Sequence, residues 1–348
     1  MTGALSGGSV EFDRALSAVD GRAAASVVRG LLDDGEDPLA VLVDVIAAGQ
    51  RTVGERWQRG EWSIAKEHAA TAVAVSATEV VARFAERVPI TRGRVVVACA
   101  EREWHALPAL IIGTALRLHG WNTVLLGAST SPARLSQCLH DVGPDATAVS
   151  CSVLGALPTT RRFIEASTTA GIPVVVGGSA FGRDSTRALA LGATAWAPDA
   201  HGAVALLDGL PAVVPRAKPL PRQGVTEQSA MELDHHRLVE VLRGRWTPAA
   251  AATPDAPLER KLFSAACGEV LHQALHSVAA TLLTGDPRTI SETAAWIDRL
   301  LTARGADPRL AGELGDALAS TLLDFPTAHD LVVRYWADGL VLQGEHTS

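Results

Sequence analysis

Apolar residues recur at three- and four-residue spacing through the first 90 residues, which is the pattern of amphipathic helices. Pro38 suits the first turn of one helix, and Ser63 is a candidate N-cap for the last. We therefore expect a four-helix bundle within residues 8–90. Its predicted helices cover residues 12–18, 22–32, 38–57 and 64–87.

From Gly93 onward, short apolar runs alternate with helical segments. The predicted strands are residues 94–100, 123–127, 146–151, 173–177 and 194–197. The predicted helices are residues 107–118, 131–142, 158–170, 182–191 and 202–210. This alternation predicts an α/β domain over residues 91–210, with a doubly wound, five-stranded parallel sheet of Rossmann-like type. The first turn lacks the GxGxxG pattern of dinucleotide-binding folds.

Residues 211–226 are rich in proline and predict an extended linker. After the linker, residues 227–345 predict an all-α domain of helices joined by short turns. Its predicted helices are residues 231–243, 257–284, 287–304, 308–323 and 327–342. The fold class is therefore multi-domain: a helical bundle, an α/β domain and an all-α domain.

Composition excludes several classes of function. The 348 residues include 38 acidic and 31 basic side chains without a basic stripe, so direct nucleic-acid binding is not expected. No apolar run reaches membrane-spanning length, and residues 1–10 lack the pattern of a signal peptide. The four cysteines form no CxxC pair, which favours a reduced, cytoplasmic protein.

The first predicted strand of the α/β domain is followed by Glu103 and His105. Ligands of open α/β sheets bind beyond the carboxyl ends of the strands, where both residues fall. A metal-bound imidazole commonly donates its second N–H to a carboxylate, so Glu-x-His can form a ligand and its orienting partner. Alone, however, the triplet is more typical of a loop histidine beside an incidental acid.

Short polar and glycine motifs follow the next three strands in turn. They are Gly127 and Ser131, then Ser150, Ser152 and Leu154, then Gly177, Gly178 and Phe181. With Glu103 and His105, this ordered set resembles the cobalamin-binding domain of methionine synthase, corrinoid methyl carriers and B12-dependent photoreceptors. The resemblance covers roughly residues 93–210. The sequence departs from the family's Asp/Glu-x-His-x-x-Gly motif at Pro108, which stands in place of the glycine.

The resemblance implies that His105 is the lower axial ligand of cobalt and that the dimethylbenzimidazole tail is displaced into the sheet. Ser152 would hydrogen-bond the buried base, and Gly177 and Gly178 would leave room for it. The other motif residues are expected to contact the cofactor.

The helical bundle contains Trp57 and, after nine intervening residues, Glu67 and His68. This spacing resembles the signature of CarH-type B12 photoreceptors, in which the bundle covers the upper corrin face. The resemblance implies that Trp57 packs on the 5′-deoxyadenosyl group of adenosylcobalamin and that Glu67 contacts it. His68 would ligate cobalt after photolysis. The alternative is a core tryptophan and a solvated Glu-His pair.

The all-α domain has no comparable motif. His272 and His276 can share one helix face, and Cys267 precedes them. In architecture the chain resembles the photocobilins, which join B12 to a globin- or phycobiliprotein-like bilin domain. That resemblance implies biliverdin as a second chromophore, with these three residues as candidate contacts.

The leading hypothesis is a light sensor in which photolysis of the Co–C bond drives a conformational or oligomeric change. It favours a signalling protein over an enzyme, and we expect a homo-oligomer with a downstream signalling partner. One alternative is a corrinoid methyl carrier of a methyltransferase system. The other is a regulatory module that senses B12 without photochemistry.

Overall fold

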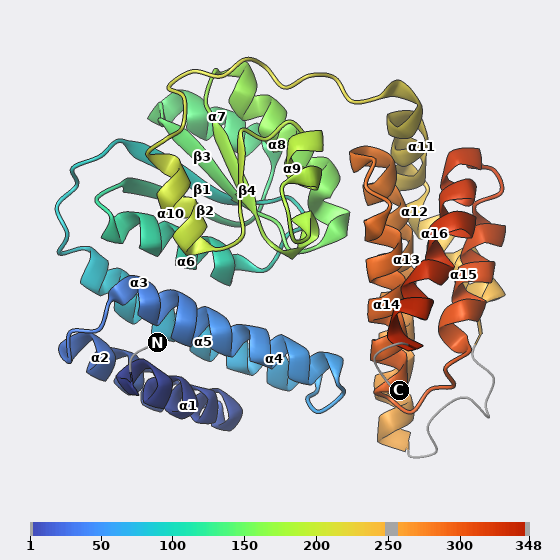
Figure 1. Cartoon of the computed structure of the whole chain (residues 1–348), viewed down its shortest axis with the longest axis horizontal. Coiled ribbons are helices and arrows are strands. Elements are labelled where there is room, and N and C mark those ends of the chain that lie inside the picture. The colour runs from blue at the N-terminus through green and yellow to red at the C-terminus, as the bar shows by residue number, and fades with distance from the viewer. Residues whose placement is uncertain (1–2, 248–256, 345–348) are drawn as a thin grey trace. The chain divides into compact units, whose positions relative to one another are not determined.

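The computed structural model describes residues 3–247 and 257–344 (Figure 1). The chain divides into two compact units. One comprises residues 1–57 and 62–218, and the other residues 58–61 and 219–348. In the described part of the chain, no helix is both long and apolar enough to cross a membrane.

The first unit begins with a helical region, as the hydrophobic spacing predicts. Its helices are α1 (Gly3–Ala18), α2 (Gly21–Asp33), the continuous run of α3 (Pro38–Ala40), η1 (Val41–Ala47) and α4 (Ala48–Gln58), and α5 (Ile64–Ala85). Side-chain caps begin three of them. Asp20 accepts from the Ala23 N–H, Asp37 from Leu39 and Ser63 from Lys66.

The run from α3 to α4 differs from the single α-helix predicted there, because η1 is a π-helix. Within it Val41, Leu42, Val43, Val45 and Ile46 are all buried. The wider π turn lets more consecutive side chains face the core than a 3.6-residue repeat allows. The hydrophobic pattern does not predict a π-helix, because it does not specify which carbonyl accepts a hydrogen bond from each backbone N–H.

The five-stranded parallel sheet is confirmed, in the order β2-β1-β3-β4-β5. Its strands are β1 (Arg94–Ala100), β2 (Asn122–Thr130), β3 (Ala146–Ser150), β4 (Val174–Gly177) and β5 (Ala195–Ala197). Chain order reverses between β1 and β3, which pair directly from Val95–Ala146 to Cys99–Ser150. A reversal of this kind opens a crevice at the carboxyl ends of the two strands.

Five helices follow the strands: α6 (Ala106–Leu118), α7 (Pro132–Val142), α8 (Leu157–Thr169), α9 (Thr186–Ala190) and α10 (Ala200–Leu207). Helix α6 packs on the sheet and also contacts η1 and α5 (Figure 1). One buried cluster joins Leu107, Ile111 and Ala115 of α6 to the apolar residues of the N-terminal helices. The N-terminal helices therefore form a cap held over α6 and beside the carboxyl edge of the sheet.

The segment after α10 stays attached to the α/β domain as far as Lys218. Arg161 is buried on α8 and donates to the carbonyls of Leu191 and Lys218, each at 2.6 Å. The Ala217 N–H donates to Thr168 Oγ1 at 3.1 Å. The boundaries predicted for the domains and the linker stay predictions.

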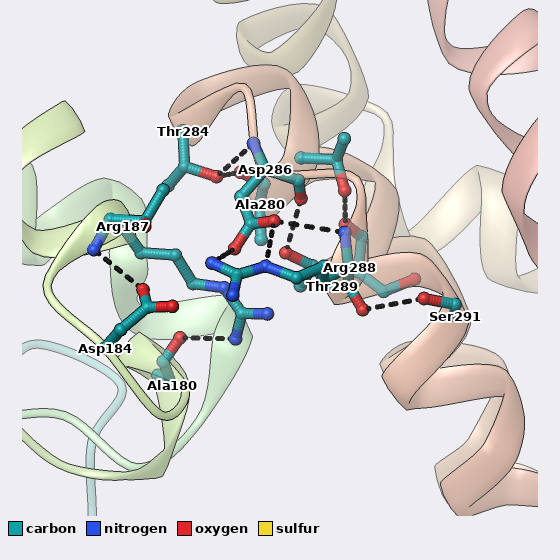
Figure 2. Close-up of polar contacts among 12 residues, drawn as sticks. Ala180, Asp184, Arg187, Ala280, Thr284, Asp286, Arg288, Thr289 and Ser291 are labelled. Carbon is teal, nitrogen blue, oxygen red and sulfur yellow. Dashed lines mark hydrogen bonds and ion pairs between the residues drawn. The ribbon is translucent and has the colours of Figure 1, made fainter. Parts of the chain in front are cut away.

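The second unit contains α11 (Arg222–Leu233), α12 (His235–Arg245), α13 (Pro257–Thr284), α14 (Arg288–Thr302), α15 (Leu310–Thr321) and α16 (Pro326–Gly344), which confirms a helical C-terminal region. Buried Trp246 and Trp336 tie it together, since their indole N–H groups donate to the carbonyls of Leu310 and Ala311. At the start of α14, Asp286 pairs with the guanidinium of Arg288 (Figure 2).

The prediction of one helix over residues 231–243 is wrong, because α11 and α12 occupy residues 222–245. Helix α11 packs against α13 at Gly224, where a Cβ would overlap the Leu282 carbonyl oxygen. This close backbone approach explains a helix that begins inside a segment of linker-like composition, because packing rather than helix propensity stabilises it.

Gly177 ends strand β4, and Gly178 follows it. At both positions the protein's own backbone leaves no room for a side chain. A Cβ on Gly177 would lie 2.6 Å from the Ala197 carbonyl oxygen. Gly178 has a φ of +109°, and a Cβ there would overlap the carbonyl of Cys151. The neighbouring strand and loop therefore exclude a side chain at both positions, and the role predicted for these glycines, room for a bound base, stays a prediction.

Replacing Gly178 with Ala should lower the free energy of unfolding of the first unit by about 3 kcal/mol or more, because left-handed backbone strain adds to a backbone clash. Gly127→Ala is the matched control, since Gly127 has a φ of +75° with nothing within 4 Å. It should cost only about 1–2 kcal/mol. Urea unfolding followed by circular dichroism measures both, and equal losses would contradict the role of the Cys151 carbonyl.

Candidate functional site

The candidate site is built around the carboxylate of Glu103, which follows β1 and is 0% exposed. Its Oε1 accepts the His105 backbone N–H at 2.9 Å and lies 2.6 Å from His105 Nδ1. Its Oε2 accepts the backbone N–H groups of Ser152 and Val153, from the loop after β3. One buried carboxylate therefore joins the loops at the carboxyl ends of two adjacent strands.

His105 is held by this carboxylate but remains accessible. Its side chain is 60% exposed, and within the described residues its Nε2 makes no hydrogen bond. An imidazole whose Nδ1 faces a carboxylate presents an Nε2 lone pair in a defined direction, which is the arrangement of a metal-bound histidine.

The pKa values of the pair shift in opposite directions. Burial alone would raise the pKa of Glu103, but hydrogen bonds from the His105 ring and from two backbone N–H groups lower it overall. The hydrogen bond to Glu103 raises the pKa of His105 above its ordinary 6.5 against the effect of burial, and the charges of Glu103 and Glu67 raise it further.

These shifts fix the sign of the pH dependence. The stability contributed by ionised Glu103 is present above its unfolded-state pKa and is lost as the pH falls through its folded-state pKa. The contribution of protonated His105 is complete below its unfolded-state pKa and is lost as the pH rises through its raised folded-state pKa. Both contributions are therefore complete between the two unfolded-state pKa values, and one or the other declines outside that range.

A cavity of about 430 Å³ lies between the cap, the start of α6 and the carboxyl ends of β3, β4 and β5. Three buried polar atoms without a hydrogen-bond partner belong to residues that line it: Ser150 Oγ, Trp196 Nε1 and Gln50 Oε1. A buried polar group without a partner costs free energy, so these atoms are suited to a ligand with its own donors and acceptors. The apolar lining suits a flat aromatic group.

The cap contributes Glu67 to the site. Its negative charge contributes to the raised pKa of His105, after the hydrogen bond and the charge of Glu103. The Oε1 of Glu67 accepts the Thr71 hydroxyl at 2.9 Å, and that hydroxyl accepts the Gln50 side-chain N–H at 2.7 Å. His68 lies beside Glu67, with Nε2 3.3 Å from Oε2 and a side chain that is 75% exposed.

The other residues predicted from sequence lie in several settings. Ser152, Gly177 and Gly178 line the cavity, and Ser131 caps α7 by accepting the Arg134 N–H. Gly127 lies within β2, Leu154 begins a 3₁₀ turn and Phe181 is fully buried. Trp57 lies half-buried near the end of α4. The roles of all these residues toward a cofactor stay predictions.

Sequence reasoning missed Gln50 and Trp196. Both occupy element interiors where a polar or aromatic residue is ordinary, so no motif identifies them. Only their convergence on one cavity, with partnerless buried atoms, indicates a function.

In the second unit, the structure brings His272 and His276 together with His235. The Nε2 of His235 lies 2.9 Å from Nδ1 of His272, and the His235 and His276 rings stack with centroids 4.5 Å apart. Among the described residues, no group of three or more His, Cys, Asp or Glu could hold a metal ion. Burial raises the pKa of the Cys267 thiol to about 12, so it is a poor nucleophile for covalent attachment of a chromophore.

Comparison with protein families now gives the class. Residues 93–207 match a family model described as a B12 binding domain, and residues 11–81 match a second model with the same description. The chain therefore contains B12-binding domains, and they support cobalamin as its cofactor. The residues present fit that group: one accessible imidazole for cobalt, and a cavity with partnerless polar atoms for the nucleotide base.

Among solved structures, the monomethylamine corrinoid protein of Methanosarcina barkeri aligns at 16% identity and a TM-score of 0.50, over 57% of this chain and 96% of its own. That likeness concerns the fold. The methanol:cobalamin methyltransferase complex of the same organism aligns at 19% identity, TM-score 0.32, over 57% and 77%. A cobalamin-binding protein of Desulfitobacterium hafniense DCB-2 aligns at 21%, TM-score 0.32, over 57% and 96%. Comparison with curated proteins finds no match.

In the protein without cobalamin, His105 should titrate above 6.5, and Glu103→Gln should lower its pKa by removing the hydrogen-bonded charge. Glu67→Gln is the matched control, since it removes a charge without removing that hydrogen bond, and it should lower the pKa by less. NMR titration of the ring protons measures both. If both variants shift His105 equally, the hydrogen bond is not the dominant cause.

Proposed function

We propose that this chain is a corrinoid protein that binds cobalamin with His105 as the lower axial ligand and uses its helical cap to control the upper face. One observation carries the proposal: an accessible Nε2 on an imidazole held by a fully buried carboxylate. That carboxylate also bonds Ser152, which lines the adjoining cavity.

The residues have distinct parts in this proposal. Glu103 holds Nδ1 of His105, so that Nε2 is presented to cobalt and the ligand is more basic. The cavity receives the displaced nucleotide base, whose one free ring nitrogen would accept from the Ser150 hydroxyl or from the Trp196 N–H, both of which lack partners. Cobalamin supplies the cobalt–carbon bond chemistry, and the protein supplies the ligand, the enclosure and the response.

The first candidate use is carriage of a methyl group between partner methyltransferases. The family matches to B12-binding domains and the fold shared with a corrinoid protein support it. A carrier must expose the upper face of its corrin to a partner, so the cap would move away during transfer.

The second candidate use is light sensing with adenosylcobalamin. The Trp57, Glu67 and His68 signature supports it, together with the effect of the Glu67 charge in raising the pKa of His105. In this use Trp57 packs on the adenosyl group, and losing that group shifts the cap or the oligomeric state. Biliverdin would bind the second unit on the face that carries His235, His272 and His276. The homo-oligomer, the downstream partner and the cytoplasmic location stay predictions.

Replacing His105 with Ala should remove the protein ligand and give a base-on or water-ligated absorption spectrum with hydroxocobalamin. The affinity should fall by at least about tenfold, since even an orienting partner of a metal ligand costs 10–100-fold when it is changed. His119→Ala, at the C-terminal end of α6, is the control. An unchanged spectrum in His105→Ala would show that the axial assignment is wrong.

Illumination distinguishes light sensing from methyl-group carriage. A sensor loaded with adenosylcobalamin in the dark should change its absorption spectrum and its elution volume after green light, and Trp57→Ala should weaken the change in elution volume. A carrier should cycle through methylcobalamin with no light-driven change in shape. An unchanged spectrum and elution volume would eliminate light sensing, and no red-shifted band on addition of biliverdin would eliminate the bilin.

A further inference from the structure

Two arginines line the cavity from different elements of the first unit: Arg51 on α4 of the cap and Arg183 in the loop between β4 and α9. Neither has a hydrogen bond or ion pair with the described residues. The one acidic residue of the lining, Asp199, accepts the Gly202 N–H at 2.8 Å as the cap of α10. The lining of this otherwise largely apolar cavity therefore includes two exposed arginine side chains without counter-charges among the described residues.

Neighbouring residues fix the backbone of the loop that carries Arg183. Arg187 is only 2% exposed, and its Nη1 donates to the Ala180 carbonyl at 3.4 Å (Figure 2). Gly182 has a φ of +77° and lies directly against this guanidinium, since a Cβ there would come 3.0 Å from Nη1. Asp184 accepts the Thr186 N–H at 2.9 Å. The loop backbone on both sides of Arg183 is therefore fixed by hydrogen bonds and close packing.

We infer that Arg51 and Arg183 bind the phosphate of the cobalamin nucleotide tail, an inference that rests on the proposed function. The peripheral side chains of the corrin are neutral amides, so the phosphodiester is the anionic group that two unpartnered guanidinium groups would recognise. Arginine suits this role because its planar fork matches phosphate oxygens and its charge strengthens each hydrogen bond.

A phosphate bound by these two arginines would determine which corrinoids the protein binds and would link the cap to the α/β domain. Because Arg51 belongs to the cap and Arg183 to the α/β domain, a phosphate between them ties the two together. The protein then distinguishes corrinoids with a nucleotide tail from cobinamide, which lacks the base, the ribose and the phosphate.

The test uses absorption titration to measure how tightly the full chain binds hydroxocobalamin and diaquacobinamide. Arg51→Gln and Arg183→Gln should each weaken hydroxocobalamin by about tenfold, the effect of a hydrogen bond to a charged group. Neither should change the affinity for diaquacobinamide. Arg29→Gln, at an exposed position on α2, is the matched control and should leave both affinities unchanged. Added salt should weaken hydroxocobalamin more in the wild type than in the double variant.

Other results would contradict either the phosphate assignment alone or the proposed function as well. Arginine variants that bind hydroxocobalamin as tightly as the wild type, or that weaken diaquacobinamide equally, overturn the phosphate assignment and leave the proposed function intact. A wild-type protein that binds neither corrinoid overturns both. Circular dichroism spectra matching the wild type ensure that a lost affinity reflects the guanidinium group and not misfolding.

Discussion

The carboxylate of Glu103 is the constraint on which the first unit depends. It is fully buried, and its two oxygens together face three backbone N–H groups and one ring nitrogen. Burying a carboxylate costs several kcal/mol unless hydrogen bonds compensate it, so these partners must keep their positions. Its charge also adds to burial in raising the pKa of Cys99 and Cys151 to about 12, which keeps both thiols protonated.

This constraint positions the chemistry. The partners of Glu103 come from the loop after β1 and the loop after β3, the two strands at which chain order reverses. His105 therefore lies at the crevice of the sheet and beside the cavity, not at an arbitrary surface loop. The cap completes the arrangement, because it packs on α6 and contributes Gln50 and Arg51 to the lining of the cavity.

Several buried groups near the cavity gain no stability from the protein alone. Ser150, Trp196 and Gln50 each leave one buried polar atom without a partner, and three more such atoms among the described residues, of Asp13, Arg117 and Trp121, lie outside the cavity lining. Native proteins retain few such groups, and those that they retain need a physical explanation. In the proposed function, a bound nucleotide tail would supply partners for such groups.

The sequence by itself determined the elements and the order of the motifs. The alternation of apolar runs predicted the parallel sheet, and Ser63 marked a helix start that the structure retains. Glu-x-His after the first strand predicted the pair that proves to be hydrogen-bonded. These features are local, since they depend on residues within a few positions of one another.

Only the tertiary structure decided which residues share the site. Gln50, Arg183 and Trp196 lie far apart in the chain and belong to no motif, yet they line one cavity. The same holds for α11, which packs closely against α13 at Gly224. Hydrophobic periodicity states which face of an element is buried. It does not state which element covers that face, and that choice is what creates a binding site.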